Sequence, residues 1–107
     1  MRHETAAEAR RLLPWASPDG NPCYLLGDGI GYVSRLANNM ESVQLGMADE
    51  LLGHVADMLD DPHVTPVQLR YVAARMAESL RDVHRIAESR GERLVALGLG
   101  LGLGAQG

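Results

Sequence analysis

Four histidines and one cysteine are the side chains of this 107-residue chain best suited to bind a metal or act as a nucleophile. If the surrounding segment is helical, the spacing of Glu50, His54 and Asp57 places three possible metal ligands on one face. A di-metal site in a four-helix bundle requires inward carboxylates and a Glu-x-x-His spacing instead, and the chain lacks that spacing. We therefore expect a solvated acidic face here and no metal site.

For Cys23 and a histidine as a nucleophile and base pair, the sequence shows no third residue that would position them, and the neighbours of Cys23 are apolar. Cysteines in such surroundings are inert and serve packing. Because a single cysteine cannot form an internal disulfide, we expect a cytoplasmic protein.

The glycine-rich segment Gly27-Asp28-Gly29-Ile30-Gly31 lies where phosphate-binding loops occur, between a strand-like run and a helix. Its spacing is GxGxG and not GxGxxG, no second strand follows to complete a βαβ unit, and Asp28 would repel a phosphate. We expect Asp28 to cap the following helix. No catalytic residue or cofactor site is predicted, and the chain does not read as an enzyme.

Two apolar stripes with helical spacing determine the predicted architecture, on either side of a turn at Asp61-Pro62-His63. We expect an all-α fold built on a long antiparallel helical hairpin, with helices over 29–60 and 66–93. Thr65 is suited to the N-cap of the second helix, and Pro66 to its first position. A break of the first helix at Gly46 is the alternative that the sequence leaves open. The members of the stripes are Val33, Leu36, Met40, Val43, Met47, Leu51, Val55 and Leu59, and then Leu69, Val72, Met76, Leu80, Val83 and Ile86.

Facing residues of an antiparallel hairpin have residue numbers with a constant sum. These stripes meet that test, since Val43 with Val83 gives 126 and Val55 with Val72 gives 127. We expect Val43, Met47, Met76, Leu80 and Val83 to be buried between the helices.

Residues 1–28 are expected to cap the hairpin and to form one domain with it over 1–93. Residues 4–13 fit a short helix that Pro14 ends. Ser17-Pro18-Asp19-Gly20 has the residues of a type I turn, which predicts a small hairpin or an ordered loop after that helix. The low-complexity Leu/Gly tail, 94–107, allows two interpretations, a mobile tail or a docking peptide for another protein.

The first long helix carries a second apolar stripe, which includes Leu45 and Leu52. A helix that is apolar on two sides must be covered on two sides. The N-terminal segment or a second copy of the chain would supply the cover, and the copy gives a homodimeric four-helix bundle.

The two predicted helices differ in charge, and the charge of the chain limits the classes of macromolecule that it can bind. The net charge of −4 argues against direct binding of nucleic acid, and no apolar run approaches the ~20 residues that span a membrane. Between Asn38 and Leu69 there are six acids and no arginine, which predicts a basic protein partner such as a DNA-binding regulator. The acids are Glu41, Asp49, Glu50, Asp57, Asp60 and Asp61, and the residues expected to bind the partner are Glu41, Asp49, Glu50 and Asp57 with Leu45 and Leu52.

The run LPWASPDGNPCYL, followed by the helices containing ESVQLGMADELLGH and LRYVAARMAESLRD, resembles small uncharacterised cytosolic helical proteins of high-GC actinobacteria. The resemblance covers residues 12–93. It implies a bacterial cytoplasmic setting and a regulatory neighbourhood, and it carries over no functional residue.

These patterns predict a non-enzymatic protein-interaction or regulatory protein. The alternative is a small-ligand sensor, with a pocket between the cap and the helices formed by Trp15, Tyr24 and Tyr32.

Overall fold

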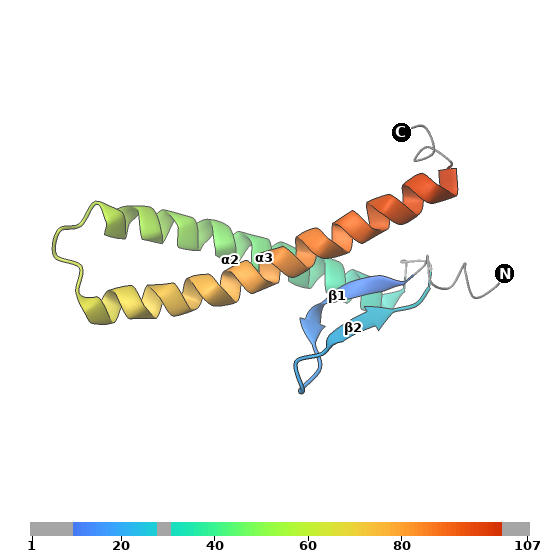
Figure 1. The fold of residues 1–107 in the computed structure, drawn as a ribbon, viewed down its shortest axis with the longest axis horizontal. Coiled ribbons are helices and arrows are strands. Elements are labelled where there is room, and N and C mark those ends of the chain that lie inside the picture. The colour runs from blue at the N-terminus through green and yellow to red at the C-terminus, as the bar shows by residue number, and fades with distance from the viewer. Residues whose placement is uncertain (1–9, 28–30, 102–107) are drawn as a thin grey trace.

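The computed structural model describes residues 10–27 and 31–101, with side chains to residue 98. A two-stranded sheet, β1 (Arg11–Ala16) and β2 (Pro22–Leu25), precedes two long helices, α2 (Tyr32–Leu59) and α3 (Pro66–Leu101). The helices form an elongated antiparallel hairpin, and the sheet packs near the end opposite the turn (Figure 1). The molecule measures 61 × 35 × 21 Å. The predicted helical hairpin is therefore confirmed.

The strands β1 and β2 pair antiparallel, with Leu12 opposite Tyr24 and an irregularity between Leu12 and Ala16. The amide of Gly20 donates to the Ser17 carbonyl at 2.8 Å, and the amide of Ser17 donates to the Asn21 carbonyl at 2.9 Å. Gly20 has a φ of +84°, a conformation that glycine adopts without strain. Of the two alternatives predicted around this turn, a small hairpin or an ordered loop, the structure has the hairpin.

The helix expected over 4–13 is wrong for its described part, because residues 11–13 belong to β1. Pro14 lies inside the strand rather than ending a helix, within the stretch where the ladder is irregular. A proline there removes no regular ladder bond. Leu12 and Leu13 are buried in the strand, so tertiary packing outweighs the helix propensity of the segment. Residues 4–9 lie outside the described part of the chain.

Helix α2 runs without interruption through Gly46, so the predicted length is confirmed and the break is not found. Its N-cap is Gly31, which makes no side-chain capping bond, and the expected cap Asp28 lies outside the described residues. At the turn, the amide of Gln68 donates to Thr65 Oγ1 at 3.1 Å, and the amide of Thr65 donates to Gln68 Oε1 at 2.9 Å. This reciprocal capping box confirms Thr65 as the start of the second helix.

Helix α3 continues to Leu101, beyond the predicted end near residue 93. The first part of the expected tail is therefore helical. The run Leu94–Leu97 consists of Leu, Val and Ala, and a helix already formed adds residues at little cost. Residues 102–107 lie outside the described part.

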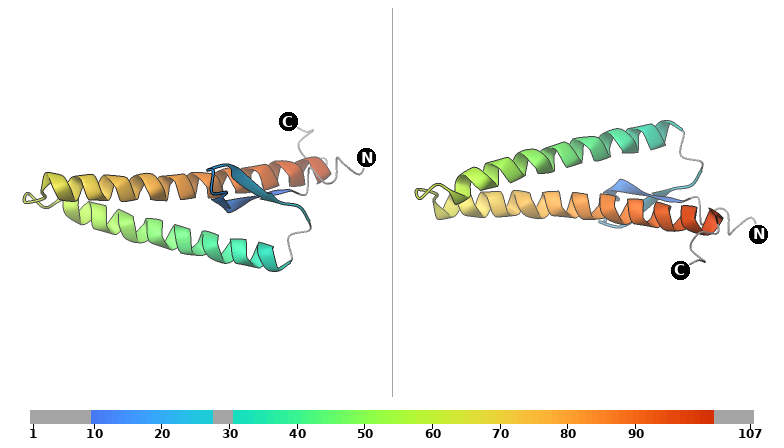
Figure 2. Two further views of the ribbon diagram at one scale, coloured as in Figure 1. Left: turned by 90° about the horizontal axis from the view of Figure 1, so that it is seen from below. Right: turned by 90° about the horizontal axis from the view of Figure 1, so that it is seen from above.

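The core lies where the sheet meets the helices, and Leu12, Leu13, Ala37 and Ile86 are its buried apolar members at that end. Figure 2 shows the helices separating toward this end, with the sheet packed against them. Four residues of the predicted seam are exposed, namely Val43, Met47, Met76 and Leu80, and Val83 is half-buried. The prediction of a buried seam is therefore wrong for one chain, because helices that diverge around a cap cannot cover each other along their length.

Candidate interaction surface

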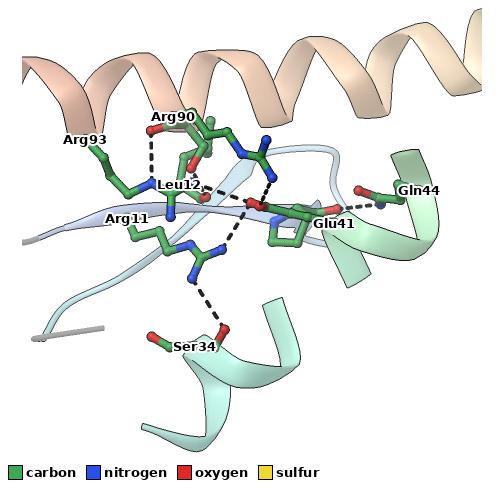
Figure 3. Close-up of polar contacts among 9 residues, drawn as sticks. Arg11, Leu12, Ser34, Glu41, Gln44, Arg90 and Arg93 are labelled. Atoms are coloured by element: carbon green, nitrogen blue, oxygen red, sulfur yellow. Dashed lines mark hydrogen bonds and ion pairs between the residues drawn. The ribbon is translucent and has the colours of Figure 1, made fainter. Parts of the chain in front are cut away.

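A buried ionic cluster joins the sheet to both helices, and we call Arg11, Glu41, Arg90 and Arg93 the Glu41 cluster (Figure 3). Arg11 Nη2 lies 3.1 Å from Glu41 Oε2, and both side chains are more than nine-tenths buried. Arg90 Nη2 is 3.4 Å from Glu41 Oε1, and Arg93 Nη2 is 3.9 Å from Glu41 Oε2. One carboxylate from α2 thus holds an arginine of β1 and two of α3.

Further hydrogen bonds reinforce this attachment. Ser89 Oγ donates to the Leu12 carbonyl at 2.8 Å, and Gln44 Nε2 donates to the Pro14 carbonyl at 3.0 Å. Arg11 Nη1 also donates to the Ser34 carbonyl at 3.4 Å. The side chains that bridge sheet and helices therefore come from both long helices.

The cluster is crowded with positive charge. Burial lowers the pKa of Arg93 from its ordinary value and the charges of Arg11 and Arg90 lower it further, while Glu41 opposes them. Guanidinium groups remain charged under these conditions and do not exchange protons with a substrate. The cluster is suited to fixing the sheet in place, and it presents no nucleophile or general base.

Glu41 therefore cannot serve the role predicted for it. It is 3% exposed, and its carboxylate is already bound by three arginines. Its place among the residues that bind a basic partner is corrected accordingly. The other predicted acids, Asp49, Glu50 and Asp57, are exposed.

A signal for the burial of Glu41 exists in the sequence. Ser34, Ala37 and Glu41 follow one another at spacings of three and four, and the same row continues as Leu45, Ala48 and Leu52. A carboxylate in an otherwise small and apolar row indicates an inward-facing charge with a partner. The sequence does not indicate Arg11 as its partner, because residues 4–13 have the local pattern of a helix.

An open apolar groove of about 380 Å³ lies between the two helices, and we call it the α2–α3 groove. Leu52 and Leu80 stand in it on opposite helices, 68% and 64% exposed. The structure thus places the predicted partner-binding residues Leu45 and Leu52 opposite Met76, Leu80 and Val83 of the apolar stripe on α3. The groove is lined by Leu45, Ala48, Asp49, Leu51, Leu52, Val55, Met76, Ser79, Leu80 and Val83.

A second groove, of about 630 Å³, lies beside the turn. Asp57, Asp61 and His54 border it together with apolar side chains that include Val67 and Tyr71. His63 Nδ1 lies 3.7 Å from Asp61 Oδ1 in the exposed turn. Within residues 10–27 and 31–101, no three His, Cys, Asp or Glu side chains are placed to hold a metal ion.

The aromatic residues of the alternative ligand pocket do not converge on a described groove. Trp15 is half-buried, Tyr24 and Tyr32 are exposed, and none of the three borders the grooves described above. The guanidinium of Arg10 covers the ring of Tyr24 at 4.1 Å from its centroid. The small-ligand sensor stays a prediction.

No helix in the described part of the chain is long and apolar enough to cross a membrane. In comparisons with models of protein families, with curated proteins and with solved structures, nothing matches this chain.

Proposed function

We propose that the protein is a cytoplasmic, non-enzymatic interaction or regulatory protein, and that a second copy of the chain occupies the α2–α3 groove. The two hairpins then form a four-helix bundle. The observation that carries the proposal is the exposure of large apolar side chains from both helices along one groove. Soluble proteins rarely expose a contiguous apolar face without a partner for it.

The charges of the two helices favour a second copy as the occupant. Helix α2 carries Arg35 against four acids, a formal charge of −3, and α3 carries six arginines against four acids, a formal charge of +2. The same face on a second chain therefore supplies both an acidic and a basic helix. A twofold interface uses one patch twice, so a patch with both charges is self-complementary.

The size of the groove sets the expected affinity. Its α2 wall runs from Leu45 to Val55, about 15 Å of helix, and two helices side by side are about 20 Å wide. The resulting area is about 300 Å² per chain, less than half of the area per partner in a standard stable interface. We therefore expect a weak, reversible dimer that forms at tens to hundreds of micromolar protein.

A basic protein, such as a DNA-binding regulator, is the proposed partner of this dimer. The groove beside the turn supports this partner, because Asp57 and Asp61 stand next to Val64 and Val67 on its walls. A basic side chain with an apolar stem fits such a mixed surface. Its binding is expected to weaken with salt, mainly through a slower association rate.

The experiment that tests the homodimer is Leu52→Glu, measured by light scattering and sedimentation equilibrium from 5 to about 300 µM, the range in which an interface of this size associates. The wild type should shift from monomer to dimer with concentration. Leu52→Glu should remain a monomer with unchanged helicity, because it places a charge in an apolar interface.

Val43→Glu is the matched control, since Val43 is 59% exposed on the same helix and does not border the α2–α3 groove. It should dimerise as the wild type does. A wild type that is monomeric over the whole range, or equal loss of dimer in both variants, would contradict the proposal.

A further inference from the structure

We infer that the groove beside the turn binds one amphipathic helix of the basic partner, and we call it the turn groove. Its walls are formed by side chains within residues 54–61, on the α2 side, and within residues 64–72, on the α3 side. The basic side chains of the bound helix lie against the first wall, and its apolar side chains lie against the second. This inference rests on the basic partner proposed above and specifies the element that is recognised. It does not require the homodimer.

The two walls of the turn groove differ in chemistry. Asp57 and Asp61 border it on the α2 side, four residues or about one helical turn apart. Val67 and Tyr71 border it on the α3 side with the same spacing, and both are large exposed side chains. An acidic pair therefore lies across the groove from an apolar pair. An occupant that fits both walls carries positive charge on one side and apolar surface on the next.

The acidic charge of this groove is not compensated by arginine within the described residues. The Asp57 carboxylate makes no hydrogen bond or ion pair there. Asp61 Oδ1 accepts a hydrogen bond from the His63 amide at 2.8 Å, and no described arginine borders the groove. These carboxylates favour a basic occupant, because complementary charge selects a partner and speeds its encounter.

The walls themselves favour a helix as the occupant. Residues 54–61 extend over about 10 Å, which is two turns of a bound helix. The backbone groups of α2 and α3 are bonded within these helices, so an extended segment would find no backbone partners along them, whereas a helix satisfies its own. Two turns place basic residues four positions apart, the spacing of Asp57 and Asp61, beside an apolar row at spacings of three and four.

The turn groove and the α2–α3 groove open on opposite faces of the hairpin. They share no residue, and Leu52 and His54 are about 160° apart around α2 while Leu80 and Tyr71 are about 180° apart around α3. A homodimer formed through the α2–α3 groove therefore leaves both turn grooves open. A partner with two such helices would bind this dimer bivalently, with a gain in avidity.

The test is a selection of random peptides of about 16 residues, four turns of helix, displayed on phage and captured by the full chain. The selected peptides should carry two basic residues three or four positions apart beside an apolar row. As free peptides, they should gain helical circular dichroism on binding, and their binding should weaken with salt.

The affinity of a selected peptide is then measured by fluorescence anisotropy with folded variants. Asp57→Asn should weaken binding about two- to fivefold, as loss of an exposed charge pair does, and Tyr71→Ala about tenfold. Asp49→Asn is the matched control, since it makes the same change of charge on α2 but borders the α2–α3 groove, and it should leave the affinity unchanged. Leu52→Glu should also bind the peptide as the wild type does.

The outcomes separate this inference from the proposals on which it builds. Selection of no peptide, or of uncharged or acidic peptides, overturns both the bound helix and the basic partner. Basic peptides that bind without gaining helix, or whose affinity falls with Asp49→Asn and not with Asp57→Asn, overturn the helix in the turn groove and leave the basic partner standing. Equal binding by the wild type and Leu52→Glu, with both monomeric in light scattering, supports this inference and overturns the homodimer.

Discussion

Replacing Glu41 by glutamine should destabilise the protein more than any other single change of charge. The side chain of Arg11 is 7% exposed, and Glu41 supplies its only counterion in the described structure. Breaking a buried ion pair by removing one partner typically costs about 3–5 kcal/mol, since the remaining charge stays buried and unpaired. Arg90 and Arg93 are more than a third exposed, so water takes over much of their interaction and they add little.

The assay is urea unfolding followed by circular dichroism at low micromolar concentration, where the proposed dimer is dissociated. Domains of this size unfold with about 5–15 kcal/mol, so the variant loses a large fraction of its stability. With a dependence of about 2 kcal/mol per molar urea, the midpoint should fall by about 2 M. The near-ultraviolet signal of Trp15 should change as well, because β1 carries this residue and is held by the cluster.

Glu78→Gln is the matched control, since Glu78 pairs with Arg75 on the surface of α3 and its side chain is 61% exposed. Its effect should stay within about 0.5 kcal/mol. Replacing Arg11 and Glu41 together by methionine should recover much of the loss, since no buried charge of that pair remains. If Glu41→Gln costs less than about 1 kcal/mol, the Glu41 cluster is solvated and does not hold the sheet in the way inferred.

Two further predictions concern packing and hydrogen bonding. Leu80→Ala should cost below about 1 kcal/mol in the monomer because Leu80 is 64% exposed, whereas Ile86→Ala, at 2% exposed, should cost about 2–5 kcal/mol; equal losses in urea unfolding would show that α3 packs differently. Ser89→Ala should cost about 1–3 kcal/mol by removing the buried hydroxyl that donates to the Leu12 carbonyl, and faster amide hydrogen exchange in β1 should accompany it; unchanged exchange there would contradict this role for Ser89.

The parts of the fold that the sequence predicted well depend on neighbouring residues. Thr65 and Gln68 cap each other across three positions, and Ser17 and Gly20 close their turn over the same span. The long apolar periodicity also sufficed for two helices, because their lengths outweigh a single unfavourable glycine at position 46. Such signals are readable without knowledge of the tertiary structure.

The parts of the fold that the sequence did not predict depend on contacts between residues far apart in the chain. Arg11 bonds to Glu41, 30 positions away, and Ser89 bonds to the Leu12 carbonyl, 77 positions away. The segment before Pro14 has local features of a helix, and only burial of Leu12 and Leu13 against α2 and α3 makes it a strand. Propensity alone cannot weigh that burial.

One row of α2 connects the sheet to the proposed interface. Its first three members, Ser34, Ala37 and Glu41, are small or charged and are buried at the end where the sheet packs. Its continuation, from Leu45 through Ala48 to Leu52, is apolar and open along the α2–α3 groove. The row thus changes from polar or small residues to apolar ones at the point where the sheet no longer covers it.

This change separates two kinds of contact on a single helix face. A polar anchor such as Glu41 requires a fixed partner at a defined distance, which the chain supplies itself through Arg11. Apolar side chains such as Leu45 and Leu52 have no such requirement, and in the proposed dimer the helices of a second copy would cover them by contact alone. The substitutions at Glu41 and Leu52 should accordingly have separable effects, the first on unfolding of the monomer and the second on association. If both changed the same property, the covered and open halves of the row would belong to one continuous core.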